Sequence, residues 1–280
     1  MFAAFVITLR PTSSAVIGNS TGRSLHGLFF KMLEQQDPAL AAQAHADNEI
    51  KAMTVSPLRG RLRREGERNI VLPDQLYRVR YTTLSDGLFN ALSKILLGKF
   101  LYRERVMIDE AEFAVQDVTV ESAASRGWGR LASAQEVWNN TKSQSEVTLR
   151  FASPTTFRQN KLNLVFPVPK NVFHSYRERW NAFTLYPIDD EFVSWVEQNV
   201  AVTAHHLQTR QVWHSDFALH GFVGWARFIA KDRDMRRLKE WNALADFSFF
   251  SGTGQKTTQG MGQTRRLEGN FEHSSQDETE

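Results

Sequence analysis

Residues 249–266 combine side chains and a spacing that are typical of a phosphate-binding segment. They lie between a diphenylalanine and a basic pair, carry one lysine, Lys256, and contain four glycines: Gly252, Gly254, Gly260 and Gly262. Glycine lets backbone N–H groups approach an anion closely, and hydroxyl and amide side chains such as that of Thr257 add neutral donors. We therefore expect this segment to lie along the phosphates of a ligand.

A nucleotide-binding P-loop matches the segment poorly. That motif requires a glycine directly before its Lys-Ser/Thr pair, but Gln255 precedes Lys256 here. It also requires a strand before the loop and a long helix after it, whereas only a short, mostly polar and acidic stretch follows. A nucleotide triphosphatase is therefore disfavoured.

The composition predicts about two domains of ~100–200 residues each, with packed cores. The chain has 280 residues, of which 41% are hydrophobic, and 20 phenylalanines. It has no cysteine, which excludes disulfides, thiolate metal sites and a cysteine nucleophile. Residues 1–9 are too short to span a membrane and lack a charged start, so they read as a buried first strand. We expect a soluble, cytoplasmic protein with no membrane partner.

The net charge of +3 conceals an uneven distribution. From Glu268 to the end the chain has five acidic residues and no lysine or arginine, and without this segment 34 Lys and Arg residues stand against 26 Asp and Glu residues. A basic body suggests a polyanionic partner, most simply nucleic acid, although a basic enzyme without such a partner fits the charge equally well. Residues 269–280 are predicted to be a disordered acidic tail.

The densest basic run has four arginines: Arg59, Arg61, Arg63 and Arg64. Arg68 follows closely, and two glutamates, Glu65 and Glu67, accompany them. Such a run is most often a solvated loop. Its density also suits contact with phosphates or with the groove of an RNA hairpin.

The first half of the chain alternates strands and helices. An apolar run covers residues 2–10, Ser20 or Thr21 can cap a helix with an apolar stripe from Leu25 to Leu33, and Asp37-Pro38 opens a short helix that ends at His45. Strands follow near 52–58 and 76–83, then a helix over 86–97 and strands near 101–108 and 113–120. This order, β-α-β-β-α-β, predicts a ferredoxin-like unit.

The second half repeats this order loosely. Residues 121–145, rich in Ala, Ser, Gly and Asn, are interpreted as the inter-domain region. We then expect a strand at 146–151, helices near 169–183 and 188–199, strands near 200–213 and 216–230, a helix over 233–245, and a last strand after the glycine-rich segment. The predicted fold class is α+β, with ferredoxin-like domains over 1–125 and 126–268.

Five segments occur in a fixed order along the chain. They are a helix ending in a histidine (40–45), a strand that begins with lysine and ends in Thr-Val-Ser-Pro-Leu (51–58), a strand with Pro-Thr and Phe-Arg (147–158), a helix with Arg-Trp-Asn (172–181) and a Gly-Phe-Val-Gly-Trp strand (221–225). In this order they resemble the Cas-six family of CRISPR-associated endoribonucleases in the RAMP superfamily, whose domains are RRM-like. The glycine-rich segment falls where that family keeps an RNA-contacting loop.

The resemblance implies metal-independent cleavage of CRISPR repeat RNA into guide RNAs, with no cofactor. The ribose 2′-hydroxyl attacks the adjacent phosphate and leaves a 2′,3′-cyclic phosphate and a 5′-hydroxyl. Such a reaction needs a base, a cation at the phosphorane and an acid for the leaving oxygen. His45 matches the family's general-base position, and Lys51 matches its phosphate-stabilising lysine.

The acid is where the sequence departs from part of the family. Some members carry a tyrosine on the first helix, and Phe30 is the aligned residue here. His26 lies one helical turn before Phe30 on the same face. We hypothesise that His26 is the acid, with water or Lys51 as alternatives; a structural histidine flanking the apolar stripe is the plainer reading.

Repeat RNA is the expected partner, and other subunits of a CRISPR effector complex are further candidates. Arg158 and Arg177 are additional candidate RNA contacts. The alternative function is a non-catalytic RNA-binding RAMP subunit of an effector complex. The His45–Lys51 pair favours the nuclease, because a purely structural subunit has no need of it.

Overall fold

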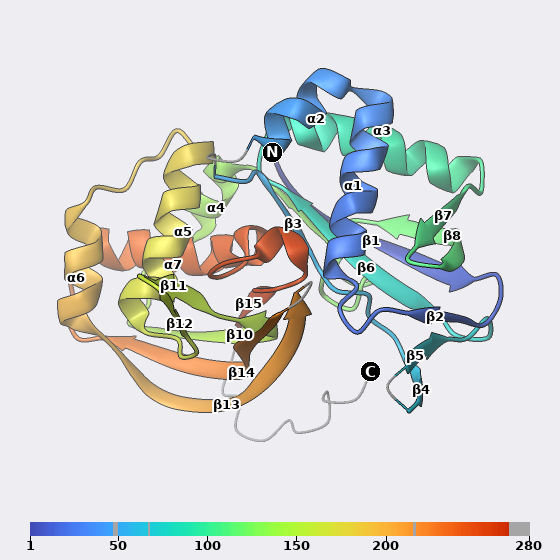
Figure 1. Cartoon of the computed structure of the whole chain (residues 1–280). Helices are drawn as coiled ribbons and strands as arrows, with labels where there is room; N and C mark the ends of the chain where they lie inside the picture. The colour runs from blue at the N-terminus through green and yellow to red at the C-terminus, as the bar shows by residue number, and fades with distance from the viewer. Residues whose placement is uncertain (47–49, 67, 215–216, 269–280) are drawn as a thin grey trace. The chain divides into compact units, whose positions relative to one another are not determined.

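The computed structural model describes residues 1–46, 50–66, 68–214 and 217–268, which form two compact units (Figure 1). The first unit comprises Met1–Leu131 together with Thr258–Gly260. The second comprises Ala132–Thr257 and the described residues from Met261 onward. The domain limits 1–125 and 126–268 stay predictions, and the predicted acidic tail, 269–280, lies outside the described residues.

The elements of the first unit, in chain order, are β1 (Phe2–Pro11), β2 (Ala15–Ile17), α1 (Gly22–Gln36), α2 (Pro38–His45), β3 (Met53–Val55), β4 (Arg63–Glu65), β5 (Arg68–Val71), β6 (Tyr77–Thr83), α3 (Asp86–Leu101), β7 (Arg105–Ile108), β8 (Ala111–Thr119) and β9 (Arg130–Ala132). The unit is built on one large antiparallel sheet with the strand order β3-β6-β1-β8-β7, to which β9 adds by pairing with β1. A small sheet, β2-β5-β4, accompanies it.

The hydrophobic core of this unit is formed by apolar residues that alternate along its strands and recur every three to four residues along its helices. Along β6 the side chains of Tyr77, Val79 and Tyr81 are buried and point to one face, since alternate strand residues share a face. Tyr81 pairs with Phe5 of β1. The buried stripe of α1, which includes Leu25 and other residues at helical spacing, joins the same hydrophobic core. Figure 1 shows α1 and α3 on this face of the sheet.

The elements of the second unit, in chain order, are α4 (Ala134–Asn140), β10 (Glu146–Thr155), β11 (Phe157–Gln159), β12 (Leu162–Leu164), α5 (Pro169–Phe183), α6 (Glu191–Asn199), β13 (Val200–His214), β14 (Phe217–Ala230), α7 (Met235–Ser251) and β15 (Thr264–Leu267), with a 3-10 turn at Thr257–Gln259 before the last strand. They form a four-stranded sheet, β13-β14-β10-β15, and a two-stranded sheet, β11-β12.

The two main sheets have equivalent topologies. In the first unit β1 lies between β6 and β8, and in the second β10 lies between β14 and β15. In each, the first strand of a β-α-β-β-α-β sequence is thus flanked by the third and the fourth. The predicted α+β class with tandem ferredoxin-like units is confirmed.

Two local predictions were wrong. Helix α3 continues to Leu101, so the strand predicted from 101 begins only at Arg105. Helix α7 continues to Ser251 rather than ending at 245, because Phe247 and its apolar neighbours are buried and extend the helical face. Residues 121–145, interpreted as the inter-domain region, contain β9 and α4, and the boundary between the two units falls within them, after Leu131.

Helix α4 has a sequence signal for its start within the segment interpreted as the inter-domain region. Ser133 and Glu136 form a capping box there, in which each side chain accepts from the other residue's backbone amide. Among the helices that the structure describes, none is both long and apolar enough to cross a membrane.

Candidate active site

His26 lies in α1 and is held by a distant backbone group. Its Nδ1 atom is 3.0 Å from the carbonyl oxygen of Thr258, in the glycine-rich segment. A carbonyl oxygen only accepts hydrogen bonds, so Nδ1 of His26 must carry the proton and donate it. In neutral His26 the lone pair is therefore on Nε2, and in the protonated ring Nε2 is a second donor.

His45 is the last residue of α2. The helix begins as the sequence predicts, with Pro38 in its first turn and the Asp37 carboxylate accepting a hydrogen bond from the Leu40 amide at 3.0 Å. The eight residues of α2 then carry the chain from this cap to His45, which is exposed. The structure thus places His45 at a helix C-terminus.

The imidazole rings of His26 and His45 lie near each other. Their centroids are 6.5 Å apart. The ring of Phe30 contacts both, with centroid distances of 4.8 Å to His26 and 4.9 Å to His45. Phe30 therefore supplies an apolar surface shared by the two imidazoles, and it has no hydroxyl that could donate a proton.

Lys51 is held at the same helix end. Its ammonium group donates to the carbonyl oxygen of Ala44 at 3.3 Å and to that of Ala46. These two residues flank His45, so the contacts keep the ammonium group beside the histidine's backbone. A lysine at a helix C-terminus is favoured by the unpaired carbonyls and by the helix dipole. Because an ammonium group has three N–H donors, these two contacts leave capacity for an anionic oxygen.

The surroundings of His26 disfavour the protonated, positively charged form of its ring. Burial is the largest influence and lowers the pKa of His26 below its ordinary value of 6.5. The positive charges of His45, Lys51 and Arg23 lower this pKa further, while the hydrogen bond to Thr258 opposes them. Arg23 lies one turn before His26 on α1, and the sequence interpretation missed it although an i, i+3 spacing could have indicated it.

A hollow of about 380 Å3 opens beside His45. The residues that line it come from α1 and α2: Phe30, Glu34, Pro38, Ala41, Ala42, His45 and Ala46. The lining is largely apolar apart from Glu34 and His45. It offers room next to the imidazole of His45 for a flat, partly apolar group.

The basic run begins next to the start of α1. The amide of Leu58, just after strand β3, donates to the Thr21 hydroxyl at 2.8 Å. Thr21 is the N-cap residue of α1, but its side chain makes no capping hydrogen bond to the helix. Arg59 follows and pairs through its backbone with Arg78. The other predicted contacts, Arg61, Arg63 and Arg64, are exposed, the last two on strand β4. The run is therefore an ordered, solvent-facing arm.

Arg158 and Arg177 have different surroundings. Arg158 is exposed on β11, and its Nε donates to the carbonyl of Asn160 at 3.0 Å. Arg177 of α5 is 8% exposed and is committed to the fold. Its Nε donates to the carbonyls of Ile188 and Asp189 at 2.9 and 2.8 Å, and its Nη2 to the Asp190 carboxylate at 2.5 Å.

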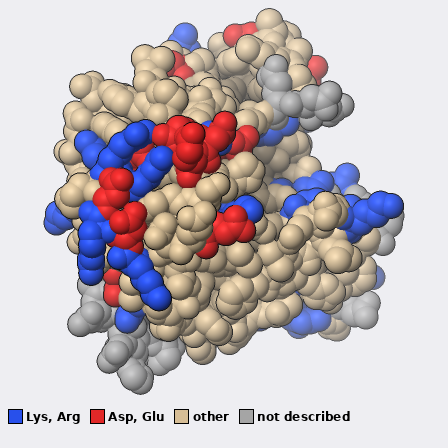
Figure 2. Space-filling model, turned by 90° about the vertical axis from the view of Figure 1, so that its left-hand side faces the viewer, with Lys and Arg blue, Asp and Glu red and all other residues tan. Residues whose placement is uncertain are grey.

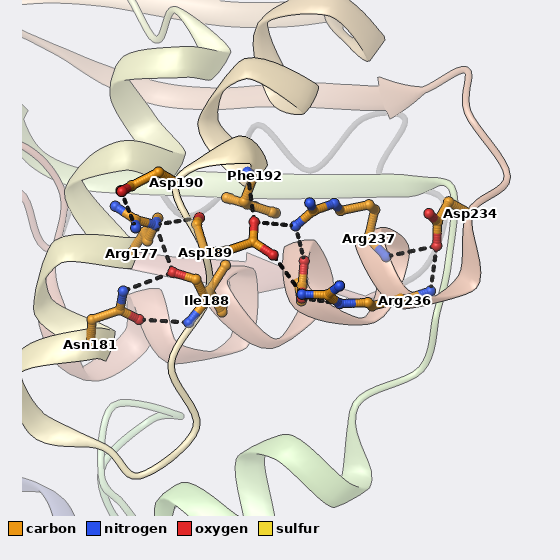
Figure 3. Close-up of polar contacts among 10 residues, drawn as sticks. Arg177, Asn181, Ile188, Asp189, Asp190, Phe192, Asp234, Arg236 and Arg237 are labelled. Carbon is orange, nitrogen blue, oxygen red and sulfur yellow. Dashed lines mark hydrogen bonds and ion pairs between the residues drawn. The ribbon is translucent and has the colours of Figure 1, made fainter.

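Figure 3 shows that these contacts are part of a larger polar network in the second unit. The Asp189 carboxylate bridges Arg236 at 2.5 Å and Arg237 at 2.7 Å, both on the first turn of α7. Arg177 is thus placed where its guanidinium stabilises a loop.

Figure 2 shows one face of the molecule on which acidic and basic side chains are intermixed. The surplus of basic residues therefore does not make every surface uniformly positive.

The four predicted glycines of the glycine-rich segment all have positive φ angles, from 64° at Gly252 to 93° at Gly260. Backbone packing explains Gly254 most directly, because a Cβ there would lie 2.3 Å from the carbonyl oxygen of Thr156. The adjacent Gln255 amide donates to that same oxygen at 3.0 Å. Gly262 donates its amide to the carbonyl of Pro154 at 3.0 Å. These amides are therefore used within the fold.

The two predicted side-chain contacts of the segment differ in exposure. Lys256 is partly exposed, whereas Thr257 is buried, and its hydroxyl lies 3.4 Å from Nη2 of Arg179. Arg179 of α5 also donates to the carbonyl of Gly254 at 2.9 Å, and burial lowers its pKa to about 10. Sequence reasoning singled out Arg177 on this helix, but Arg179 is the arginine that contacts the glycine-rich segment.

Family models match both halves of the chain. Residues 1–139 match the CRISPR Cas6 N-terminal domain, and residues 149–264 match the CRISPR-associated endoribonuclease Cas6. The chain belongs to the Cas6 family. The resemblance inferred from the sequence motifs is thereby confirmed.

Individual relatives are more distant. A CRISPR-associated endoribonuclease Cas6 from Streptococcus thermophilus is 24% identical over 130 residues. That match covers 45% of this chain and 53% of the relative, so it spans about half of each.

Solved Cas6 structures share the fold over nearly the whole chain. A Cas6 product complex superposes with a TM-score of 0.81 at 23% identity, covering 95% of this chain and 100% of the other. Cas6 of Thermus thermophilus gives a TM-score of 0.73 at 24% identity, covering 95% and 98%. At such identities the likeness establishes the Cas6 fold, and the roles of individual residues must be argued from this chain.

Proposed function

We propose that this Cas6 family member is an endoribonuclease that cleaves CRISPR repeat RNA into guide RNAs without a metal ion. The observation that carries the proposal is the grouping of two imidazoles, 6.5 Å apart between ring centroids, with the ammonium group of Lys51 fixed beside His45. A base, an acid and a cation are the three groups that transesterification of RNA requires.

In the proposed reaction His45 removes the proton from the ribose 2′-hydroxyl, and the freed oxygen attacks the adjacent phosphorus. Lys51 stabilises the extra negative charge on the phosphorane. The bond from phosphorus to the 5′-oxygen then breaks, and that oxygen takes a proton from protonated His26. The products are a 2′,3′-cyclic phosphate and a 5′-hydroxyl, so no atom of water is incorporated.

The hydrogen bond to Thr258 supports Nε2 as the atom of His26 that transfers the proton, because Nδ1 is already engaged. The lowered pKa of His26 makes the protonated ring a stronger acid but a less populated one at neutral pH. We therefore expect His26 to contribute as an acid mainly in mildly acidic solution. The exposed arginines of the basic run, with Arg158 and Lys256, are the proposed RNA contacts.

The test is a single-turnover assay of repeat RNA in excess EDTA, with the end groups of the products identified. We expect cleavage with a 2′,3′-cyclic phosphate, and no cleavage when the nucleotide before the cut carries a 2′-deoxyribose. Bound but intact RNA would instead support the non-catalytic RAMP subunit. Cleavage of the deoxy substrate would exclude attack by the 2′-hydroxyl.

A further inference from the structure

Two glycines allow backbone segments that are distant in sequence to touch beside His26. Gly22 is the first residue of α1, and a Cβ at this position would lie 2.1 Å from the carbonyl oxygen of Gln259 and 2.8 Å from Cα of Gly260. A Cβ at Gly260 would lie 3.1 Å from Cα of Gly22. Both distances to Gly22's neighbours are shorter than real Cβ contacts, so only glycine fits there without displacing Gln259 and Gly260.

The contact lies on the face of α1 that carries His26. Gly22 and His26 are four residues apart, so the histidine is one turn further along the same face. Thr258, whose carbonyl accepts from Nδ1 of His26, directly precedes Gln259. The position of the Thr258 carbonyl is therefore set by the same close approach that Gly22 permits.

We propose that Gly22 and Gly260 are positioning residues for the reaction: their close approach places the Thr258 carbonyl at Nδ1 of His26 and leaves Nε2 as the nitrogen that exchanges protons. This inference rests on the proposed function. In this proposal the role of the glycine-rich segment is to orient a histidine, not to bind phosphate. General acid catalysis is sensitive to such orientation, because the transferred proton must lie within hydrogen-bond reach.

Gly22→Ala tests the proposal, and Gly27→Ala is its matched control. Both glycines lie on α1, but a Cβ at Gly27 has no described atom within 4 Å. We expect Gly27→Ala to cleave repeat RNA at the wild-type rate, since alanine is favourable in a helix. Gly22→Ala should cleave about tenfold more slowly or worse, with RNA affinity unchanged.

A spectroscopic readout separates positioning from general damage. The ¹⁵N chemical shifts of the His26 ring should report the tautomer with the proton on Nδ1 in the wild type and in Gly27→Ala, and a mixture of tautomers in Gly22→Ala. Gly260→Ala is a second displaced variant should Gly22→Ala fail to fold by circular dichroism, since its Cβ would meet its nearest neighbour at 3.1 Å rather than 2.1 Å. Its φ of 93° is unfavourable for alanine.

Two outcomes would overturn the inference: wild-type cleavage by folded Gly22→Ala, or an unchanged Nδ1-protonated tautomer in both displaced variants. Failure of the proposed function is distinguishable. In that case the wild type and Gly27→Ala would both leave RNA intact, while the ring spectra would still report whether the glycines orient His26.

Discussion

Nδ1 of His26 lies 3.0 Å from the carbonyl oxygen of Thr258, although 232 residues separate them in the sequence. The contact explains how a histidine near the start of the chain acquires a defined orientation. It also explains the competing influences on this ring, because burial lowers the pKa of His26 while the carbonyl favours the protonated form. Much of the site's expected behaviour follows from this pair.

Lowering the positive charge around His26 should raise its pKa. Lys51 is among the charges that lower it, so Lys51→Ala should move the pKa of His26 upward, toward 6.5. An NMR titration of the His26 ring in both proteins measures the shift. Lys31→Ala, which removes a like charge from an exposed position on α1 that is not among those influences, is the control and should leave the pKa of His26 unchanged. A pKa that falls in Lys51→Ala would contradict the electrostatic account.

His26 should make stability depend on pH in a defined direction. Since its folded pKa is lowered, the unfolded chain binds more protons near pH 6, and the free energy of unfolding rises with pH. This contribution is complete above about 6.5 and is lost as pH falls through the folded pKa. His26→Asn keeps a donor for Thr258 but cannot titrate. Urea unfolding between pH 5 and 8 should therefore show a shallower dependence for this variant, and an equal slope would remove His26 as the source.

Lys51 should have separable structural and chemical effects. Lys51→Ala removes the donor to Ala44 and Ala46 and should lower the free energy of unfolding by about 0.3–1 kcal/mol, as for other charges at helix ends. It should also slow cleavage by far more than this loss explains. Lys51→Arg should recover most of the stability and part of the rate. Equal rates for wild type and Lys51→Ala would show that the ammonium group serves the helix alone.

The basic run should contribute to RNA affinity by neutralising phosphates. Replacing Arg61 or Arg64 by Ala should weaken binding to any repeat sequence and reduce the slope of log K against log salt by about 1 for each phosphate that is no longer neutralised. Lys94→Ala, an exposed lysine on α3, is the matched control. RNA affinities and salt slopes equal to those of the control would show that these arginines are solvated and do not contact RNA.

Arg177 should matter for stability and not for RNA. Its guanidinium contacts the 188–190 loop through several hydrogen bonds, which a lysine cannot reproduce. Arg177→Lys should cost about 1–3 kcal/mol of unfolding free energy without changing the RNA affinity of the folded protein. Arg158→Ala, at an exposed site, should show the opposite pattern. Weaker RNA binding by folded Arg177→Lys would instead indicate that Arg177 contacts RNA.

Local signals predicted much of the fold. The Asp37-Pro38 pair predicted the start of α2, and the alternation around Tyr77 and Tyr81 predicted β6. Tertiary packing decided where these signals failed. The apolar end of α7 continues the helix because its phenylalanines are buried, and the Thr21 hydroxyl is used by Leu58 rather than by its own helix.

The candidate site was only partly predictable. Helical spacing placed His26 beside Phe30, and both rings are indeed in contact. The hydrogen bond from His26 to Thr258 and the close approach at Gly22 depend on segments more than 200 residues apart, for which no local pattern exists. Composition and the family resemblance predicted that the glycines contact RNA, which stays a prediction; their close backbone neighbours, which the structure adds, could not be read from the sequence.

The most direct measurement is the single-turnover cleavage of repeat RNA by the wild type and by His45→Ala, with RNA affinity measured in parallel. Removal of a general base typically costs about 10²–10⁴-fold in rate. We predict a loss of that size for His45→Ala with unchanged affinity. Cleavage by His45→Ala at the wild-type rate would contradict the assignment of this site as the catalytic centre.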